Sequence, residues 1–97
     1  MSDSEHTPEH GIVVYCTPFC GFCHAAKSLL HAKGTDFQEI DIFADPDRRQ
    51  EMIARSGCKT VPQIFFGQRH IGGYDDLQAL ADSGELDALL AGLHACT

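Results

Sequence analysis

Short apolar runs alternate along the chain with stretches in which apolar residues recur every three or four positions. Residues 12–16 are β-branched and continuously apolar, which is typical of a strand covered on both faces. Residues 20–33 carry apolar side chains at helical spacing and end at a glycine, which predicts a helix. Residues 37–41 alternate between apolar and polar positions and predict a second strand. Strand, helix and strand with short connections predict a right-handed parallel β-α-β unit.

The next segment predicts a helix followed by a hairpin. An aspartate and a proline begin a helix over residues 45–55, and a Ser-Gly pair closes it. Two short apolar runs, residues 63–66 and 69–71, are separated by two turn residues. This spacing predicts an antiparallel hairpin.

Two helices complete the pattern. We expect Asp75 or Asp76 to cap a helix over residues 77–82, and four leucines within residues 86–93 form the apolar stripe of another helix. The order β-α-β-α-β-β-α-α predicts a single α/β domain over residues 12–97, with a parallel half followed by an antiparallel hairpin.

The composition fits one soluble domain. The chain has 97 residues, of which 43% are hydrophobic and 22% are charged, and this argues against a disordered or fibrous protein. Its apolar runs are far shorter than the ~20 residues of a membrane-spanning helix. Residues 1–11 have neither a basic start nor an apolar stretch. We therefore expect a cytoplasmic protein with no membrane partner, in which residues 1–11 form a flexible tail.

The charge distribution limits the class of partner. A net charge of −7 argues against nucleic acid. Residues 70–97 carry five acids and no Lys or Arg, whereas residues 12–69 carry six acids and all seven bases. A few cations in that middle segment could hold a small anionic ligand, although most are expected to be solvated surface charges.

Five cysteines stand at positions 16, 20, 23, 58 and 96. An odd number without an export signal argues against a disulfide framework. Cys20 and Cys23 form a C-x-x-C pair where a strand meets a helix. Cys16, Cys58 and Cys96 are expected to be inert small hydrophobic residues.

The C-x-x-C pair has the spacing of a redox-active dithiol. Residues three apart on a helix lie ~5–6 Å apart, which suits a disulfide that opens and closes without backbone movement. Unpaired N–H groups and the positive end of the helix dipole stabilise a thiolate in the first turn, so Cys20 is the predicted nucleophile. Cys23 lies one turn deeper on the apolar stripe and is the predicted resolving thiol.

Three other interpretations of the pair are possible in principle. One is a static disulfide. The second is covalent haem, because His24 completes a C-x-x-C-H signature, although haem attachment normally follows export. The third is zinc, which would need two further ligands such as Cys58 or His70, and the chain has no second C-x-x-C motif.

The Thr60-Val61-Pro62 segment leads into the strand at residues 63–66, where a proline removes a backbone donor. The proline is either an ordinary strand start or part of a cis Val61–Pro62 bond that turns the Val61 backbone groups outward. Such groups could pair with an extended peptide as an added strand. The residues alone do not decide between the two.

Three motifs together resemble the dithiol glutaredoxins, and among them the small bacterial glutaredoxin 3 type. They are C-G-F-C after a short strand, T-V-P-Q-I-F about forty residues later, and G-G-Y-D-D-L at the start of the penultimate helix. The resemblance extends from about Ile12 to Leu90. A thioredoxin lacks the G-G-Y-D-D element and normally has Trp where this chain has Phe19.

The resemblance implies a thioredoxin-like fold, with a four-stranded mixed sheet flanked by about four helices, and glutathione as co-substrate. It assigns the glutathione site to Lys59, Thr60, Val61, Pro62, Asp75 and Asp76. The lysine would face the glycyl carboxylate. The threonine and valine would present backbone to the cysteinyl unit beside a cis proline, and the two aspartates, at a helix N-terminus, would bind the γ-glutamyl end.

The chain departs from the family pattern at two places. Thr17 stands where many members have Lys, and the loss of this cation should weaken glutathione binding by ~1 kcal/mol. Gly21-Phe22 stands where Pro-Tyr is common. The Gly-Phe pair is similar to that of monothiol C-G-F-S relatives, which hold iron–sulfur clusters.

These features predict a monomeric glutathione-dependent thiol–disulfide oxidoreductase. It would reduce protein–glutathione mixed disulfides and protein disulfides through Cys20 and Cys23, without a tightly bound cofactor. The alternative is an iron–sulfur carrier in which two subunits share a [2Fe–2S] cluster through Cys20 and two glutathiones.

Overall fold

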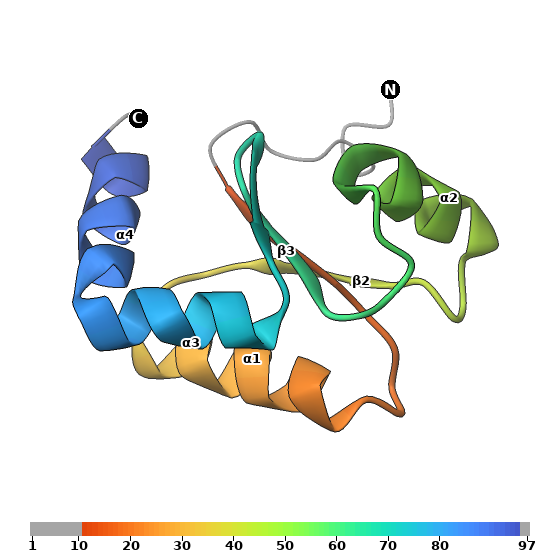
Figure 1. The fold of residues 1–97 in the computed structure, drawn as a ribbon, viewed down its shortest axis with the longest axis horizontal. Helices are drawn as coiled ribbons and strands as arrows, with labels where there is room; N and C mark the ends of the chain where they lie inside the picture. Colours follow the sequence, from red (N-terminus) through yellow and green to blue (C-terminus); the bar gives the residue numbers. More distant parts are fainter. Residues whose placement is uncertain (1–10, 96–97) are drawn as a thin grey trace.

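The structure is a computed structural model that describes residues 11–95. Residues 1–10, which include most of the expected tail, and Cys96 lie outside the described residues. The elements are β1 (Ile12–Cys16), α1 (Gly21–Ala32), β2 (Gln38–Asp41), α2 (Pro46–Ser56), β3 (Gln63–Phe66), β4 (Arg69–Gly72), α3 (Tyr74–Ser83) and α4 (Glu85–Ala95) (Figure 1). Of the helices described, none has the length and apolar character needed to cross a membrane.

The four strands form one mixed sheet in the order β2-β1-β3-β4. β1 pairs in parallel with β2 and antiparallel with β3, and β3 pairs antiparallel with β4. This arrangement confirms the predicted parallel half followed by a hairpin. Because Tyr15 is opposite Gln63 in the β1–β3 register, the end of β1 lies beside the start of β3. The strand that leads to Cys20 and the strand that follows Pro62 therefore meet at one edge of the molecule.

The side chains of β1 alternate between two hydrophobic cores. Ile12, Val14 and Cys16 belong to the core that α1, α3 and α4 cover, whereas Val13 and Tyr15 belong to the core beneath α2. All five are buried, as the continuous apolar run predicts. Figure 1 shows α1 and α3 together on one side of the sheet, with α2 on the other.

α1 carries the cysteine pair from the surface into the first core. Cys20 is its N-cap residue, and the helix buries Cys23, Ala26 and Leu30, which are spaced three and four apart. The chain leaves the helix through Gly34 at a positive φ of 71°, a conformation that glycine adopts readily. The helix is therefore oriented with its N-terminus at the solvent edge and its apolar stripe against β1.

α2 covers the second core and is held there by polar contacts as well as by packing. The Tyr15 hydroxyl donates to the Glu51 carboxylate and accepts from Arg55 Nη1 at 2.9 Å. The Arg55 guanidinium also lies 4.0 Å from the centre of the Phe65 ring, a cation–π contact. Burial raises the pKa of Tyr15, and the hydrogen bond to Glu51 raises it further.

α2 begins at Pro46, as the sequence predicts, but the aspartate before it does not cap the helix through its side chain. Asp45 is the N-cap residue, but its side chain makes no capping hydrogen bond. The carboxylate of Asp41 binds the loop before the helix, where its Oδ1 accepts the N–H groups of Phe43 and Ala44 at 2.9 and 3.2 Å. The loop between β2 and α2 is therefore fixed by the last residue of β2.

The expectation that Asp75 or Asp76 caps α3 is wrong. The helix begins at Tyr74, with Gly73 as its N-cap residue. Glycine has no side chain with which to cap, so Asp76 acts from the first turn, and its Oδ2 accepts the Gly73 N–H at 3.0 Å. The helix thus starts close to the end of β4.

Replacement of Leu30 by alanine tests the core beneath α1. Leu30 is fully buried in that core, so we expect Leu30→Ala to lower the free energy of unfolding by about 2–5 kcal/mol. Ser28 is exposed on the same helix, and Ser28→Ala should change it by less than about 0.5 kcal/mol. Denaturant unfolding measures both changes, and equal losses would contradict the described packing.

Candidate active site

Cys20 lies at the junction of β1 and α1, where its sulfur meets the helix N-terminus. Its backbone is extended, with φ −103° and ψ 116°, and the Cys23 N–H donates to Cys20 Sγ at 3.3 Å. An N–H group aimed at sulfur from the positive end of a helix stabilises negative charge there, by ~0.3–1 kcal/mol or more when partly buried. The side chain is partly exposed. Cys20 therefore has both the access and the local field that a nucleophilic thiolate needs.

Cys23 occupies the opposite environment, three residues later. Its side chain is fully buried against the first core. Burial, together with the hydrogen bond to Cys20, raises the pKa of Cys23 to about 12. The thiol therefore remains protonated near neutral pH and is shielded from large reagents. This combination suits a thiol that attacks only a sulfur already placed beside it.

The segment before β3 lies against Cys20. The Val61–Pro62 bond is cis, which decides between the two alternatives that the sequence left open. Cys20 Sγ lies 3.7 Å from the Val61 carbonyl oxygen, in reach for a thiol donor. The buried side chain of Gln63 holds this segment from behind, because its Nε2 donates to the Thr60 carbonyl at 3.1 Å.

An open cleft of about 370 Å³ lies between the segment before β3 and the start of α3. Thr60, Val61 and Pro62 line one wall and Asp75 and Asp76 line the other. The structure therefore brings five of the six predicted ligand-binding residues around one space. The sixth, Lys59, is exposed and lies outside the lining of the cleft.

The wall formed by α3 depends on a glycine. Gly72 has a φ of +119°, and a β-carbon at this position would collide with the Asp76 carboxylate. That same carboxylate accepts the Gly73 N–H. Gly72 therefore allows the chain to turn from β4 into α3 while Asp76 stays folded against the turn.

The sequence analysis did not identify the aromatic edge of the cleft. Phe22, in the first turn of α1, stacks on Tyr74 with ring centroids 6.1 Å apart. Both rings line the cleft. The position of Phe22, two residues after Cys20, could have indicated from the sequence that it lies near the active site. Its stacking partner Tyr74 could not be predicted, because that contact depends on how α1 packs against α3.

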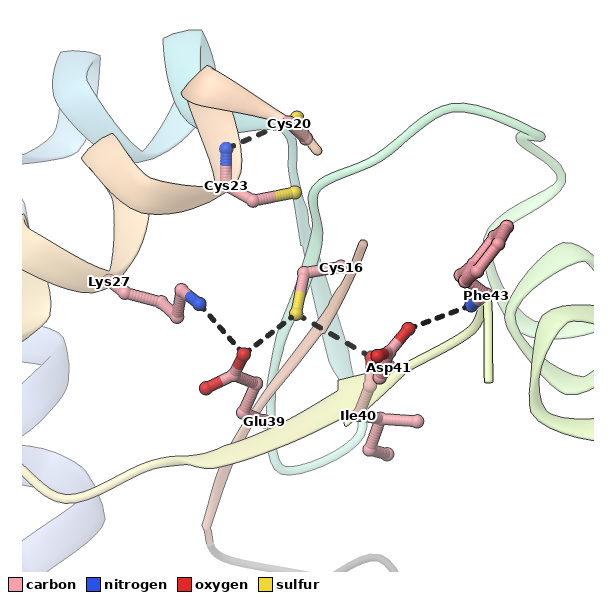
Figure 2. Close-up of polar contacts among 8 residues, drawn as sticks. All are labelled: Cys16, Cys20, Cys23, Lys27, Glu39, Ile40, Asp41 and Phe43. Atoms are coloured by element: carbon pink, nitrogen blue, oxygen red, sulfur yellow. Dashed lines mark hydrogen bonds and ion pairs between the residues drawn. The ribbon is translucent and has the colours of Figure 1, made fainter. Parts of the chain in front are cut away.

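A polar cluster beneath the cysteine pair was also missed (Figure 2). Lys27 Nζ forms an ion pair of 2.7 Å with Glu39 Oε2, and the Cys16 thiol donates to the same oxygen at 3.4 Å. The Lys27 contact lowers the pKa of Glu39, and the Glu39 contact raises that of Lys27. Burial raises the pKa of Cys16 to about 12. The cluster joins α1 to β2, and the buried Cys16 thiol stays protonated near neutral pH.

The remaining cysteines and candidate metal ligands have the following positions. Cys58 is partly exposed and lines the cleft, as does His70. Cys16, Cys20, Cys23 and Cys58 are all free thiols. Within residues 11–95 no group of three or more His, Cys, Asp or Glu side chains could hold a metal ion.

Comparisons with known proteins agree with this geometry. The family model described as Glutaredoxin matches residues 12–71. The chain is 52% identical over 79 residues to "Glutaredoxin 3" of Escherichia coli strain K12, an alignment that covers 81% of this chain and 95% of that protein. The chain belongs to the glutaredoxin family. A "Glutaredoxin" of Pseudomonas aeruginosa is 50% identical to this glutaredoxin over 80 residues, covering 82% of the chain and 95% of the relative.

Solved glutaredoxin structures show the same thioredoxin-like fold. The structure described as a buckwheat glutaredoxin–glutathione complex matches with a TM-score of 0.80 at 30% identity, covering 87% of this chain and 79% of that one. The holo form of glutaredoxin C1 from Populus tremula x tremuloides matches with a TM-score of 0.82 at 28% identity, covering 90% and 81%. As a glutaredoxin, the protein is an enzyme, a thiol–disulfide oxidoreductase.

Alkylation of the reduced glutaredoxin tests the contrast between the two cysteines. We expect iodoacetamide to modify Cys20 first at neutral pH, and Cys23 and Cys16 far more slowly, because both buried thiols have a pKa of about 12. Labelling of Cys23 should rise as the pH approaches that value, since only the thiolate reacts. Peptide mapping by mass spectrometry measures each site.

Cys58 provides the internal control for exposure. It is partly exposed, as Cys20 is, but it does not cap a helix. Faster labelling of Cys20 than of Cys58 would separate the effect of the helix N-terminus from that of access. Modification of Cys23 before Cys20 would contradict the assigned roles.

Replacement of Gly72 tests the turn that forms the α3 wall. We expect Gly72→Ala to lower the free energy of unfolding by well over ~1 kcal/mol, because it combines an unfavourable backbone conformation with a collision at Asp76. Gly34 has a φ of +71° and open space around it, so Gly34→Ala isolates the backbone cost of ~1 kcal/mol. Thermal and denaturant unfolding measure the free energy of unfolding of both variants. If Gly72→Ala and Gly34→Ala lose the same amount, the contact with Asp76 is unimportant.

Proposed function

We propose that this glutaredoxin uses glutathione to reduce protein–glutathione mixed disulfides and protein disulfides. The observation that carries the proposal is the hydrogen bond from the Cys23 N–H to Cys20 Sγ, made where that sulfur touches Val61 at the edge of the cleft. A nucleophilic sulfur next to an open, partly polar cleft suits a substrate that carries its reactive sulfur in a small peptide. The similarity to a glutaredoxin described as a glutathione complex supports the same ligand.

The cleft offers groups that complement the two ends of glutathione. The backbone of Thr60 and Val61 lies beside Cys20 and can pair with the cysteinyl unit as an added strand. The N-terminus of α3 presents backbone N–H groups for the γ-glutamyl carboxylate, and Asp75 or Asp76 presents a carboxylate for its amine. Lys59 stands outside the lining of the cleft, so its contact with the glycyl carboxylate would be made from beyond that lining.

The first chemical step is an attack on the mixed disulfide. The Cys20 thiolate attacks the glutathione sulfur, a new Cys20–glutathione disulfide forms, and the bond to the protein sulfur breaks. The protein sulfur leaves as a thiolate and takes a proton from water. The Cys23 N–H remains in place to stabilise sulfur charge that develops at Cys20.

The second step returns the enzyme to its dithiol state. A second glutathione thiolate attacks the glutathione sulfur bound to Cys20, which releases glutathione disulfide and the Cys20 thiolate. When the substrate is a protein disulfide, Cys20 first forms a mixed disulfide with it. Cys23 then attacks the Cys20 sulfur and forms the Cys20–Cys23 disulfide, while the protein sulfur leaves as a thiol with the proton that Cys23 gives up. Two glutathiones reduce that disulfide back to the dithiol and leave as glutathione disulfide. Burial keeps Cys23 protonated until then, so it does not compete for the first substrate.

Two serine variants separate these roles. We expect Cys20→Ser to abolish turnover of the mixed disulfide of glutathione and 2-mercaptoethanol, because a hydroxyl is not ionised at this position. Cys23→Ser should retain most of that activity and lose activity on a protein disulfide, which needs the second thiol. Glutathione-dependent turnover coupled to NADPH oxidation by glutathione reductase measures both.

The alternative role as an iron–sulfur carrier is distinguished by the same preparations. Cys20 is the accessible thiol of the pair, so a [2Fe–2S] cluster would have to be shared between two chains with two glutathiones. A coloured dimer from anaerobic purification that lacks reductase activity would favour that role. Full activity in Cys20→Ser would overturn both.

A further inference from the structure

The described residues expose three large hydrophobic side chains, and two of them lie within two positions of Cys20 in the sequence. Phe19, Phe22 and Phe43 are 75%, 63% and 66% exposed. Phe43 comes from the loop between β2 and α2, far from Cys20 in the sequence, and its ring packs edge-on against Phe19 with centroids 5.0 Å apart. Large apolar side chains gathered on the surface of a soluble domain mark a contact surface.

The three rings divide between two sides of Cys20. Phe22 belongs to the cleft. The other two, which we call the aromatic pair, lie outside the lining of the cleft. Phe43 follows β2, and the strand order β2-β1-β3-β4 places β2 on the side of β1 away from β3 and β4. The aromatic pair is therefore separated from the cleft by Cys20, which follows β1.

The aromatic pair is held in place rather than loosely exposed. The Phe43 N–H donates to Asp41 Oδ1 at 2.9 Å, as Figure 2 shows. The preceding residue, Ile42, is buried, and its N–H donates to the Cys16 carbonyl at 2.9 Å. The edge-to-face contact with Phe19 orients the ring further. A surface fixed in this way loses little conformational entropy when a partner binds.

We propose that the aromatic pair binds an apolar side chain of the protein substrate, adjacent to the substrate's disulfide-bonded cysteine. The inference rests on the proposed function. If glutathione occupies the cleft, the polypeptide that carries the other sulfur must leave Cys20 on a different side, and the aromatic pair is continuous with Cys20 there. Leu, Met or Phe next to the cysteine would cover both rings.

Two glutathionylated peptides test the inference. They are identical and neutral apart from one residue next to the cysteine, which is Leu in one and Ser in the other. We expect the wild-type enzyme to show a kcat/KM about fivefold higher for the Leu peptide, as suits partial burial of one leucine. Phe43→Ala should reduce that preference to near one, whereas Phe43→Leu, which keeps an apolar side chain, should retain most of it.

Two controls keep the outcomes distinct. Gln68 is exposed in the turn between β3 and β4, at the far end of the sheet from Cys20, and Gln68→Ala should keep the full preference. The mixed disulfide of glutathione and 2-mercaptoethanol has no side chain that could reach the aromatic pair, so its turnover reports the glutathione reaction alone. Loss of that turnover in the wild-type enzyme would contradict the proposed function, and this inference with it.

Three results would overturn the inference while the proposed function stands. They are equal kcat/KM values for the two peptides, a preference that survives in Phe43→Ala, and a concentration-dependent dimer that Phe43→Ala abolishes without any peptide preference. The last result would assign the aromatic pair to a second copy of the chain. Analytical ultracentrifugation of the wild-type enzyme and of Phe43→Ala, at the concentrations used for the kinetics, detects such a dimer.

Discussion

One hydrogen bond governs the chemistry of this molecule: the N–H of Cys23 donates to the sulfur of Cys20. It exists because Cys20 is the last extended residue before α1, so that its side chain folds over the first free N–H groups of the helix. The residue that supplies the N–H carries a thiol of its own, and the helix turns that thiol into the core. Two chemically identical side chains three residues apart thereby acquire opposite reactivity.

The rest of the fold brings a cleft to that sulfur. The β1–β3 register places the cis peptide bond before β3 against Cys20. The hairpin then returns the chain so that β4 ends beside the cleft, and the Gly72-Gly73 turn begins α3 there. Gln63 fixes the first wall from the core side through the Thr60 carbonyl, and Asp76 fixes the second through the Gly73 N–H. Each wall is thus stabilised by a hydrogen bond between a side chain and a backbone group of that wall.

The sequence predicts the elements and the cysteine pair because both follow from local periodicity. The strand at residues 12–16 and the apolar stripe of α1 depend only on spacing and residue type. The predicted cap of α3 was wrong because the N-cap glycine has no side chain that would mark it in the sequence. The Asp residues of the first turn are themselves typical N-cap residues and were therefore chosen instead. All of these predictions use local sequence patterns, and the error at the start of α3 is a shift of a few residues.

Contacts between different helices and strands could not be predicted from local sequence patterns. Glu39 meets Lys27 and Cys16 only because β2 lies parallel to β1 in one register, and Phe43 meets Phe19 only because the following loop is tied to Asp41. Nothing in the spacing of these residues connects them. The motif resemblance grouped residues that line one cleft, because the motifs of a family come from a shared three-dimensional site. Periodicity contains no such information.

The distance along the chain between the cysteine pair and its cleft has a consequence during synthesis. Cys20 and Cys23 leave the ribosome before Thr60, and well before Asp75 and Asp76, because translation proceeds from the N-terminus. β1 cannot complete its pairing until β3 is made. For that interval the nascent polypeptide carries two unprotected sulfhydryls without the walls that would select a reaction partner. The selectivity that the two walls give to Cys20 is therefore acquired only after synthesis has passed the start of α3.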